Sequence, residues 1–292
     1  MSNAQRIPAF VNPESGTAEG ARNALGAAGP FDIVEVPPAR LREEIESTIR
    51  KGARRILVAG GDGTVRTAAA AVAGTNVELA IFPGGTLNHF ARDHGIPTDP
   101  DEAIATATDG DVVTADAAYV GDELFINTSS IGAYVTFMRV REELERYLGY
   151  RVATLLASIR TFFYLRSYAI ELEIDGKKQT YRSPIVFIGV GERELQMPSL
   201  GNRVENGKRG LHVMIVTGRF KARLLALAWG AVSRGIESAA RSPHLDAYLV
   251  DSCSIRMKRR RARIAVDGEA LELATPLEYR VERDILRIVR GK

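Results

Sequence analysis

The chain has 292 residues, 45% of them hydrophobic and 26% charged, which is enough to bury at least one core and is typical of chains that divide into two domains. A formal net charge of +3 is too small to indicate nucleic-acid binding, so no nucleic-acid partner is expected. The single cysteine, Cys253, excludes an internal disulfide and a cysteine-based zinc site.

The apolar stretches are shorter than the ~20 residues needed to cross a bilayer, so no transmembrane segment is expected. The N-terminus enters a strand-like run at 7–11 without the basic flank and apolar centre of a secretory signal. We therefore expect a cytoplasmic protein, which could also bind peripherally at the inner face of the membrane.

The first hundred residues repeat one pattern: an apolar strand, a loop rich in small residues and an amphipathic helix. This pattern predicts a parallel sheet covered by helices. The expected strands are 7–11, 33–36, 56–59 and 79–82. The expected helices end near Ala24, cover Leu41 to Ile49 as an apolar stripe, and span 64–73 and 87–93.

Beyond about Asp116 the sequence alternates in the manner of strands, at 168–174, 181–190, 211–216 and 263–266, which predicts a mostly β second domain. Two helical segments interrupt it, at 137–165 with a break near Gly149, and at 221–241. We expect domains at 1–115 and 116–283, and the tail 284–292 could pack back on the first. A cleft between two closely joined domains is the expected place for a site.

Three loops of the first domain follow strands and should gather at the carboxyl edge of the sheet, where open α/β folds bind ligands. In the loop 60–64, Gly60 and Gly61 would let a phosphate approach the backbone amides. Gly63 is expected in a conformation closed to other residues, and Thr64 as the N-cap of the next helix. Asp62 within a phosphate loop indicates a cation or a proton transfer. Tight strand-to-helix turns also use glycine for purely structural reasons, so one loop alone does not show that the chain binds a phosphate.

The sequence Val-Ala-Gly-Gly-Asp-Gly-Thr-Val at 58–65 resembles the Gly-Gly-Asp-Gly-Thr signature of diacylglycerol, sphingosine, ceramide and NAD kinases. Further segments resemble the diacylglycerol kinase catalytic family in the same order: Asn-Pro-Glu-Ser-Gly at 12–16, Gly-Thr-Leu-Asn-His-Phe-Ala-Arg at 85–92 and Asp-Gly-Glu at 267–269. NAD kinases lack the Asn-x-Phe-Ala-Arg continuation. The chain is therefore similar to bacterial-type lipid kinases over nearly its whole length.

The resemblance implies an α/β nucleotide-binding domain followed by a β-sandwich-like domain. It also implies ATP and Mg²⁺ as cofactors and a hydroxyl lipid such as diacylglycerol as the acceptor at the membrane surface. Asp62 and Asp116 are the implied metal ligands. The implied nucleotide contacts are Asn12, Ser15, Gly60, Gly61, Gly63, Thr64, Gly85, Thr86 and Asn88.

The resemblance also implies Asp267 as the general base, supported by Glu269. Similarity to sphingosine kinases instead favours Asp62 as the base. A structural interpretation stands beside both, because Asp-Gly is the commonest hairpin turn and the chain has another at Asp175-Gly176. The sequence leaves these alternatives open.

Two departures from the family pattern are His89 and Arg209, where many relatives carry acidic residues, so an ancillary metal site could be absent. A basic run, Arg256 to Arg263, could attract phosphates or an anionic lipid surface, or be a solvated strand edge. The segment 137–165 could line an acyl groove or simply pack on the second domain.

Two rival functions remain at this point. One is a kinase of the same superfamily that acts on NAD or a soluble polyol. The other is a nucleotide- or lipid-binding protein without catalysis. The sequence also leaves open whether the chain forms a homodimer.

Overall fold

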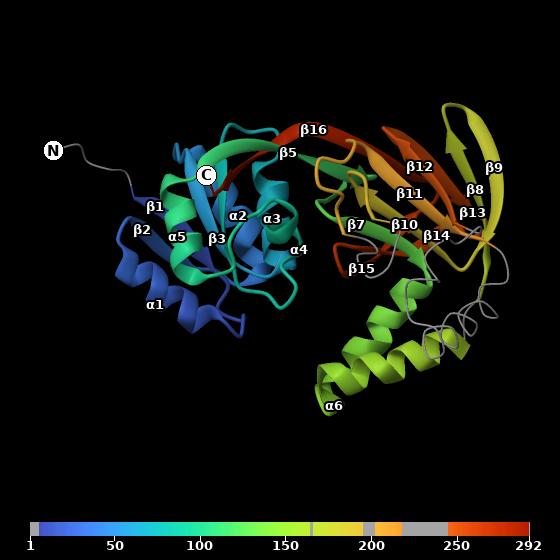
Figure 1. Cartoon of the computed structure of the whole chain (residues 1–292), viewed down its shortest axis with the longest axis horizontal. Coiled ribbons are helices and arrows are strands. Elements are labelled where there is room, and N and C mark those ends of the chain that lie inside the picture. Colours follow the sequence, from blue (N-terminus) through green and yellow to red (C-terminus); the bar gives the residue numbers. More distant parts are fainter. Residues whose placement is uncertain (1–5, 164–165, 195–201, 218–244, 292) are drawn as a thin grey trace. The chain divides into compact units, whose positions relative to one another are not determined.

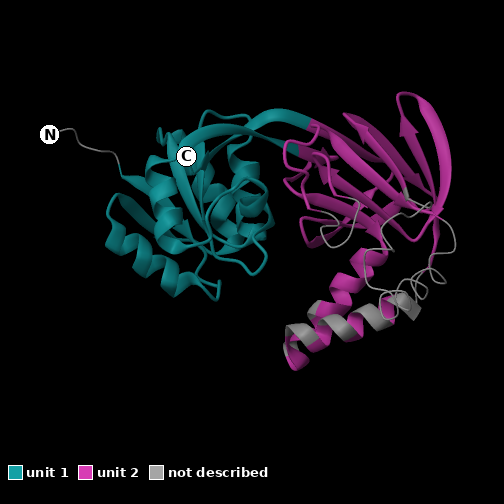
Figure 2. Cartoon of the chain, in the orientation of Figure 1, with its two compact units in different colours: residues 1–117, 282–292 teal, residues 118–281 magenta. Residues whose placement is uncertain are grey.

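The computed structural model describes residues 6–163, 166–194, 202–217 and 245–291 (Figure 1). The chain forms two compact units, unit 1 with residues 1–117 and 282–292 and unit 2 with residues 118–281 (Figure 2). Strands β5 (Asp111–Val120) and β16 (Leu277–Arg290) contribute residues to both units. The helix expected at 221–241 lies outside the described residues.

Unit 1 alternates strands and helices as predicted. Its sheet has the order β2-β1-β3-β4-β16, and the pairs along it are parallel. The elements are β1 (Ile7–Val11), α1 (Ala18–Ala28), β2 (Phe31–Glu35), α2 (Pro38–Arg50), β3 (Arg55–Gly60), α3 (Asp62–Val72), β4 (Glu78–Pro83), α4 (His89–Asp93) and α5 (Pro100–Asp109).

Helices cover this sheet because its strands are apolar on both faces, as parallel strands buried between helices are. Alternate residues of the strands, such as Leu57 and Phe82, pack with Leu25 of α1 and Ala107 of α5. The loops after β1, β3 and β4 all leave the sheet at its carboxyl edge, because these strands run in the same direction.

Unit 2 is a sandwich of two sheets. One contains β16-β13-β8-β9 and the other has the order β12-β11-β10-β7-β14-β15. Their inner faces share one core, in which Ile188 and Val213 of one sheet and Ile255 and Leu277 of the other are buried. Its remaining elements are β6 (Glu123–Phe125), β7 (Thr128–Gly132), α6 (Ala133–Phe163), β8 (Tyr168–Ile174), β9 (Lys177–Ser183), β10 (Ile185–Val190), β11 (Leu211–Val216), β12 (Leu245–Val250), β13 (Ser252–Met257), β14 (Arg261–Val266) and β15 (Glu269–Ala274).

The predicted fold class, an α/β domain followed by a mostly β domain, is confirmed. The predicted break in the long helix is also confirmed, since Gly149 in α6 has φ 72° and ψ 162°. The single strand expected at 181–190 is wrong. Pro184 separates β9 from β10, which lie in different sheets, and a proline offers no amide hydrogen to a sheet ladder.

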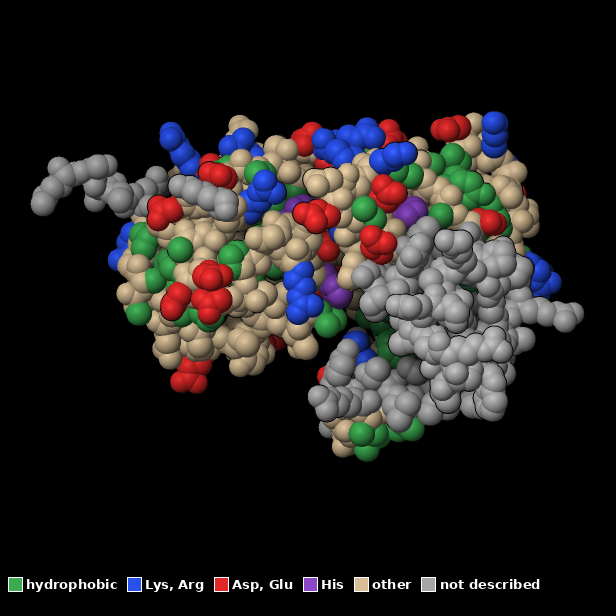
Figure 3. Space-filling view, viewed as in Figure 1, with side chains coloured by type: hydrophobic (Ala, Val, Ile, Leu, Met, Phe, Trp, Pro, Cys, Tyr) green, Lys and Arg blue, Asp and Glu red, His purple; other side chains and the backbone are tan. Residues whose placement is uncertain are grey.

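The charges on the surface and the hydropathy of the helices are as expected from the composition, within the described residues. On the face drawn in Figure 3, unit 1 carries both acidic and basic side chains, as the small net charge of +3 suggests. No helix in the described part of the chain has both the length and the apolar character that crossing a membrane requires.

Candidate functional site

Three loops of unit 1 are in direct contact at the carboxyl edge of its sheet. They are the loops 12–17, 60–64 and 83–88. Gly84 N donates a hydrogen bond to Gly60 O at 2.9 Å, and Thr17 Oγ1 donates to Gly84 O at 2.8 Å. The third loop therefore touches both the first and the second, so the predicted convergence of the loops is what the structure has.

Glycines allow this contact because no side chain would fit between the loops. A Cβ atom on Gly85 would lie 2.7 Å from Gly61 Cα, and one on Gly84 would lie 2.6 Å from Thr17 Oγ1. A Cβ atom on Gly60 would lie 2.5 Å from Thr64 Oγ1. Close packing of the loops thus explains part of the glycine requirement, and the same bare backbone leaves amides open to a phosphate.

Helix α3 begins inside the glycine loop, two residues earlier than expected. Gly61 is the N-cap, with φ −86° and ψ −174°, and its carbonyl accepts a hydrogen bond from Val65 N at 3.1 Å. The expectation that Thr64 caps this helix is wrong, because Thr64 lies in the first turn with its side chain over Gly60. The special conformation expected of Gly63 is also wrong, since Gly63 is the second residue of α3 and has no positive φ.

The early start of α3 has an electrostatic consequence. The first amides of a helix have no partner within the helix, and its positive end favours an anion. Asp62 lies in this first turn, and its Oδ1 accepts a long hydrogen bond from Phe90 N at 3.4 Å. The loop therefore combines amides suited to a phosphate with a carboxylate suited to a cation.

Asparagine side chains shape the other two loops. Asn88 has a left-handed backbone, with φ 48°, which makes α4 begin at His89 rather than at residue 87. Its Oδ1 accepts from Gly85 N, and its Nδ2 donates to Gly85 O, both at 2.8 Å. Asn12 Oδ1 accepts from Glu14 N at 2.9 Å, and Ser15 Oγ lies 3.0 Å from Thr17 Oγ1. These predicted site residues hold the loops in shape.

Two residues of this cluster were not singled out from the sequence, namely Thr17 and Gly84. Thr17 directly follows the motif at 12–16, and Gly84 precedes Gly85, so both were adjacent to the recognised segments. Thr86 is exposed at the end of the third loop. The structure therefore brings together all the predicted nucleotide-binding residues in one unit.

The second predicted metal ligand, Asp116, lies in β5 and is only 3% exposed. Its Oδ1 accepts a hydrogen bond from Asp284 N at 3.0 Å, and Asp284 Oδ1 accepts one from Thr114 Oγ1 at 2.6 Å. These bonds join β5 to β16. Within the described residues, no three His, Cys, Asp or Glu side chains gather as a metal cluster.

Asp267 and Gly268 form the turn between β14 and β15, with φ values of 45° and 91°. Asp175 and Gly176 form the corresponding turn between β8 and β9, with φ values of 49° and 74°. Both dipeptides have the left-handed backbone typical of tight hairpins. The interpretation of Asp267-Gly268 as a hairpin turn therefore explains the backbone conformation of Asp267.

Its side chain distinguishes Asp267 from Asp175. The Asp267 carboxylate accepts three backbone amide hydrogen bonds, from Ile126 N at 2.8 Å and from Asn127 N and Thr128 N at 2.9 Å each. Among the described residues, Asp175 makes no side-chain hydrogen bond of this kind. Glu269 begins β15 and is exposed.

Asn127 is a further buried polar residue beside Asp267 that the sequence did not indicate. It is 5% exposed, and its carbonyl accepts from Val190 N at 2.9 Å and from Arg193 Nη2 at 3.1 Å. Its Oδ1 has no hydrogen-bond partner among the described residues. It stands between the apolar residues 124–126 and the polar residues 128–130, so neither periodicity nor a motif indicated it.

Comparisons with known proteins find a family match that covers most of unit 1. Residues 6–120 match the family described as "Diacylglycerol kinase catalytic domain". A diacylglycerol kinase of Mycobacterium tuberculosis (strain CDC 1551 / Oshkosh) is 28% identical over 187 residues, which are 60% of this chain and 60% of that protein. The match thus spans less than two thirds of that relative.

Two other relatives carry the description "Probable lipid kinase YegS-like". One, from Pseudomonas putida, is 32% identical over 151 residues, 50% of each chain. The other, from Pseudomonas aeruginosa, is 28% identical over 260 residues, 85% of this chain and 80% of that protein. The second match extends the similarity into unit 2.

Two solved structures of Bacillus anthracis str. Sterne proteins, whose titles name a diacylglycerol kinase, have a similar fold. Each covers 98% of this chain and 97% of its own. Their TM-scores are 0.74 and 0.67, at sequence identities of 22% and 19%. The fold of the whole chain is thus one that these proteins share.

Proposed function

We propose that this chain, whose residues 6–120 match the diacylglycerol kinase catalytic domain, transfers the γ-phosphate of ATP to a lipid hydroxyl. Diacylglycerol is the proposed acceptor and phosphatidic acid the product. The observation that supports this most strongly is the contact of three loops around Gly60, Gly61, Gly84 and Gly85. The protein would bind the membrane peripherally, at its cytoplasmic face, and take the lipid from there.

The loops fit a nucleotide because their glycines leave a cradle that side chains would fill. The amides at the start of α3 and the bare backbone of Gly61 and Gly85 would hold the phosphates. Asn12 and Asn88 would keep the surrounding loops in the required shape through their hydrogen bonds to Glu14 and Gly85.

Asp62 fits a Mg²⁺ ion that arrives with the nucleotide. Such an ion is usually bound by one or two carboxylates together with phosphate oxygens and waters, so a dedicated cluster of side chains is not required. Bound Mg²⁺ would neutralise charge on the phosphates during transfer. The Asp116 carboxylate already accepts a hydrogen bond from Asp284 N. Asp116 would therefore support the metal site indirectly, by holding neighbouring residues in place, rather than bind the metal itself.

Asp267 is the proposed general base. Phosphoryl transfer has little covalent chemistry for the protein to perform, so a base mainly orients the acceptor hydroxyl and takes its proton late. A carboxylate held by three amide hydrogen bonds is rigidly oriented, which suits the task of orienting the acceptor hydroxyl. Asp62 is the rival base, and Glu269 is proposed to act only by supporting Asp267.

The decisive experiment is Mg²⁺-dependent transfer of labelled phosphate from ATP to diacylglycerol in mixed micelles, with sphingosine, NAD and glycerol assayed in parallel. Labelled phosphatidic acid above the background of an Asp62→Asn, Asp267→Asn double variant supports the proposal. Label in NAD or glycerol alone would move the activity to a soluble acceptor. ATP binding without label in any acceptor would favour a binding protein.

A further inference from the structure

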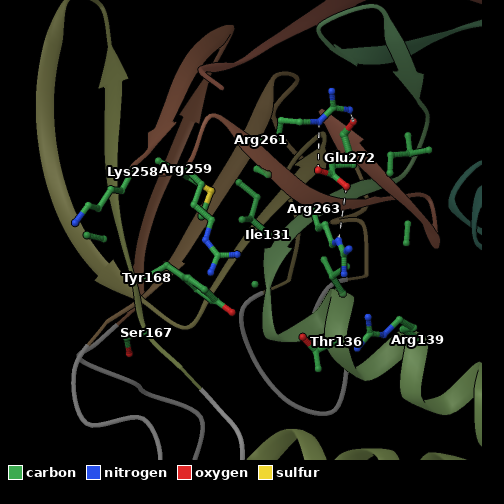
Figure 4. Close-up of a pocket in the computed structure, with 17 residues that line it drawn as sticks. Ile131, Thr136, Arg139, Ser167, Tyr168, Lys258, Arg259, Arg261, Arg263 and Glu272 are labelled. Atoms are coloured by element: carbon green, nitrogen blue, oxygen red, sulfur yellow. Dashed lines mark hydrogen bonds and ion pairs between the residues drawn. The ribbon is translucent and has the colours of Figure 1, made fainter. Parts of the chain in front are cut away.

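Unit 2 contains a large cavity whose described lining does not include Asp267. It has a volume of about 1120 Å³ and is lined by parts of β7, α6, β8, β14 and β15 and by the corner between β13 and β14 (Figure 4). Sites for small molecules usually have about 300–1,000 Å³, so the cavity is large enough for a lipid head group with part of its chains.

The lining of this cavity is apolar at its base. Ile131, Val135 and Ala262 are buried, and Met257 and Leu271 are half-buried. Tyr168, which also lines the cavity, is one of the exposed large hydrophobic residues of the chain. Of these residues, Met257, Leu271 and Tyr168 keep apolar surface exposed, and such surface gains free energy when a hydrocarbon covers it.

The charged side chains of the lining are almost all basic. Among the described residues of the lining, five are cations and Glu272 is the one carboxylate, and we call this cavity the basic cavity. The cations are Arg139, Lys258, Arg259, Arg261 and Arg263. In Figure 4 the Arg259 side chain extends in the direction of Tyr168, and Arg261 and Arg263 flank Glu272.

Glu272 cannot neutralise this group. Its oxygens lie 3.2 Å from Arg261 Nε and 3.8 Å from Arg263 Nε, and its backbone oxygen accepts from Arg261 Nη2 at 3.0 Å. The side chains of Arg261 and Arg263 are 64% and 68% exposed, so water screens these ion pairs. The one negative charge of Glu272 stands against five positive charges, so the described lining keeps a net positive charge.

The corner that carries Lys258 and Arg259 is fixed by the chain. Thr275 Oγ1 donates to Arg259 O at 2.7 Å, and Thr275 N donates to Arg260 O at 3.0 Å. Like charges on a fixed turn repel one another, and an anion bound between them would offset this repulsion.

A solvated strand edge does not explain Arg261 and Arg263, the two lining cations of β14. Strand β14 pairs with β15 on one side and with β7 on the other, so it is an interior strand of its sheet. Basic residues that prevent edge-to-edge aggregation belong on edge strands. These two arginines therefore require another explanation.

We propose that the basic cavity binds the head group of an anionic phospholipid from a bilayer. The phosphate would contact the arginines, whose planar guanidinium groups suit phosphate oxygens, and the glycerol and upper chains would cover Met257, Leu271 and Tyr168. The apolar base favours a lipid over a soluble phosphate. The lipid held here would anchor unit 2 to an anionic surface.

The test compares two double variants that remove the same charge. Arg139→Gln with Arg259→Gln changes two cations of the cavity that take no part in the Glu272 pairs. Arg256→Gln with Arg260→Gln is the matched control, because both residues are exposed members of the same run and neither lines the cavity. Binding is measured by co-sedimentation with phosphatidylcholine vesicles, with and without phosphatidylglycerol, and without nucleotide.

We expect wild-type protein to bind only the vesicles that contain phosphatidylglycerol. Each cation near an anionic membrane contributes about 1 kcal/mol, so the cavity pair should weaken binding at least about tenfold, and the control pair about threefold or less. Leu271→Ser, checked for an unchanged melting temperature, should also weaken binding because the cavity base loses apolar surface.

Equal losses for the two pairs would overturn the proposal in favour of a diffuse basic surface, and so would no loss for either. Thermal stabilisation by inorganic phosphate that depends on Arg139 and Arg259, without vesicle binding, would assign the cavity to a soluble anion and overturn it too. Because the assay contains no nucleotide, its outcome is independent of whether the chain transfers phosphate.

Discussion

Asp267 and Thr128 are joined by two reciprocal hydrogen bonds. Thr128 N donates to Asp267 Oδ1 at 2.9 Å, and Asp267 N donates to Thr128 O at 2.8 Å. Thr128 is the first residue of β7, which pairs with both β10 and β14. The position of the Asp267 carboxylate is therefore determined by the middle of a sheet, although its backbone lies in a turn.

Asp267→Asn is predicted to lower both stability and activity. The new Nδ2 group would face a backbone amide hydrogen, so at least one of the three amides loses its acceptor, at a cost of about 1–3 kcal/mol. Loss of a general base lowers the rate by about 10²–10⁴-fold. Urea unfolding and the phosphate-transfer rate measure the two effects separately.

Asp175→Asn is the matched control, since asparagine suits the left-handed turn at both sites. Stability and activity should stay within about 0.5 kcal/mol and twofold of wild type, as for ordinary surface changes. If Asp267→Asn is destabilised but retains the full rate when folded, the carboxylate is an anchor and the base is Asp62.

Gly85→Ala is predicted to weaken ATP binding at least about tenfold and to destabilise unit 1 by about 1–3 kcal/mol, as overpacking does. The added Cβ would lie 2.7 Å from Gly61 Cα and would push the two loops apart. Titration of ATP followed by fluorescence and thermal unfolding would measure these changes.

Gly20→Ala serves as its control because a Cβ there meets nothing within 4 Å and the residue lies in α1. This change should stabilise the protein by about 0.4–1 kcal/mol and leave ATP binding unchanged. Equal ATP affinity in the Gly85 variant and in wild type would mean that the loops do not form the phosphate cradle.

The loops of unit 1 could be predicted from the sequence because each follows a buried strand and carries its own local signal of glycine and asparagine. What the sequence could not provide is their mutual contact, such as the hydrogen bond from Thr17 to Gly84, 67 residues apart. Helix starts were also misplaced, because Gly61 and Asn88 act through backbone conformation rather than through a capping side chain.

Asp267 is a second case in which a contact between distant segments could not be predicted from the sequence. The dipeptide Asp-Gly indicates a turn, and the resemblance implies a base, but the amides that hold the carboxylate come from residues about 140 positions earlier. No local pattern around Asp267 contains that relationship. The basic run was visible in the sequence, but that its last residues, Arg261 and Arg263, lie on an interior strand depends on the pairing of β14.

Asp62→Asn is predicted to raise the Mg²⁺ concentration needed for half-maximal transfer and to lower the rate by at least about tenfold, since it would remove the charge of the proposed metal ligand. Stability should change little, because within the described residues the side chain accepts one long hydrogen bond, from Phe90 N at 3.4 Å. Asp32→Asn, an exposed change in β2, is the control for altered net charge. An unchanged Mg²⁺ dependence in Asp62→Asn would remove it from the metal site.

The stability of the protein is predicted to fall as the pH falls below about 6.5, because of His212 in β11. Burial lowers the pKa of His212 from its ordinary value of 6.5, and its Nδ1 accepts a hydrogen bond from Arg193 N at 2.9 Å, so the folded state keeps the neutral ring. The unfolded chain binds a proton at the higher pKa. The stabilisation is therefore complete above about pH 6.5 and decreases below it, by at most about 1.4 kcal/mol per pH unit.

His212→Asn isolates this contribution, since Asn Oδ1 can accept the same hydrogen bond from Arg193 N but does not titrate. The free energy of unfolding should fall less in the variant than in wild type between about pH 7.5 and pH 5.5, a range that brackets the ordinary histidine pKa. Carboxylates and the other histidines titrate in both proteins, so they cancel in the difference. Parallel pH profiles for the two proteins would show that His212 takes up its proton without unfolding, and that its burial in β11 does not keep it neutral.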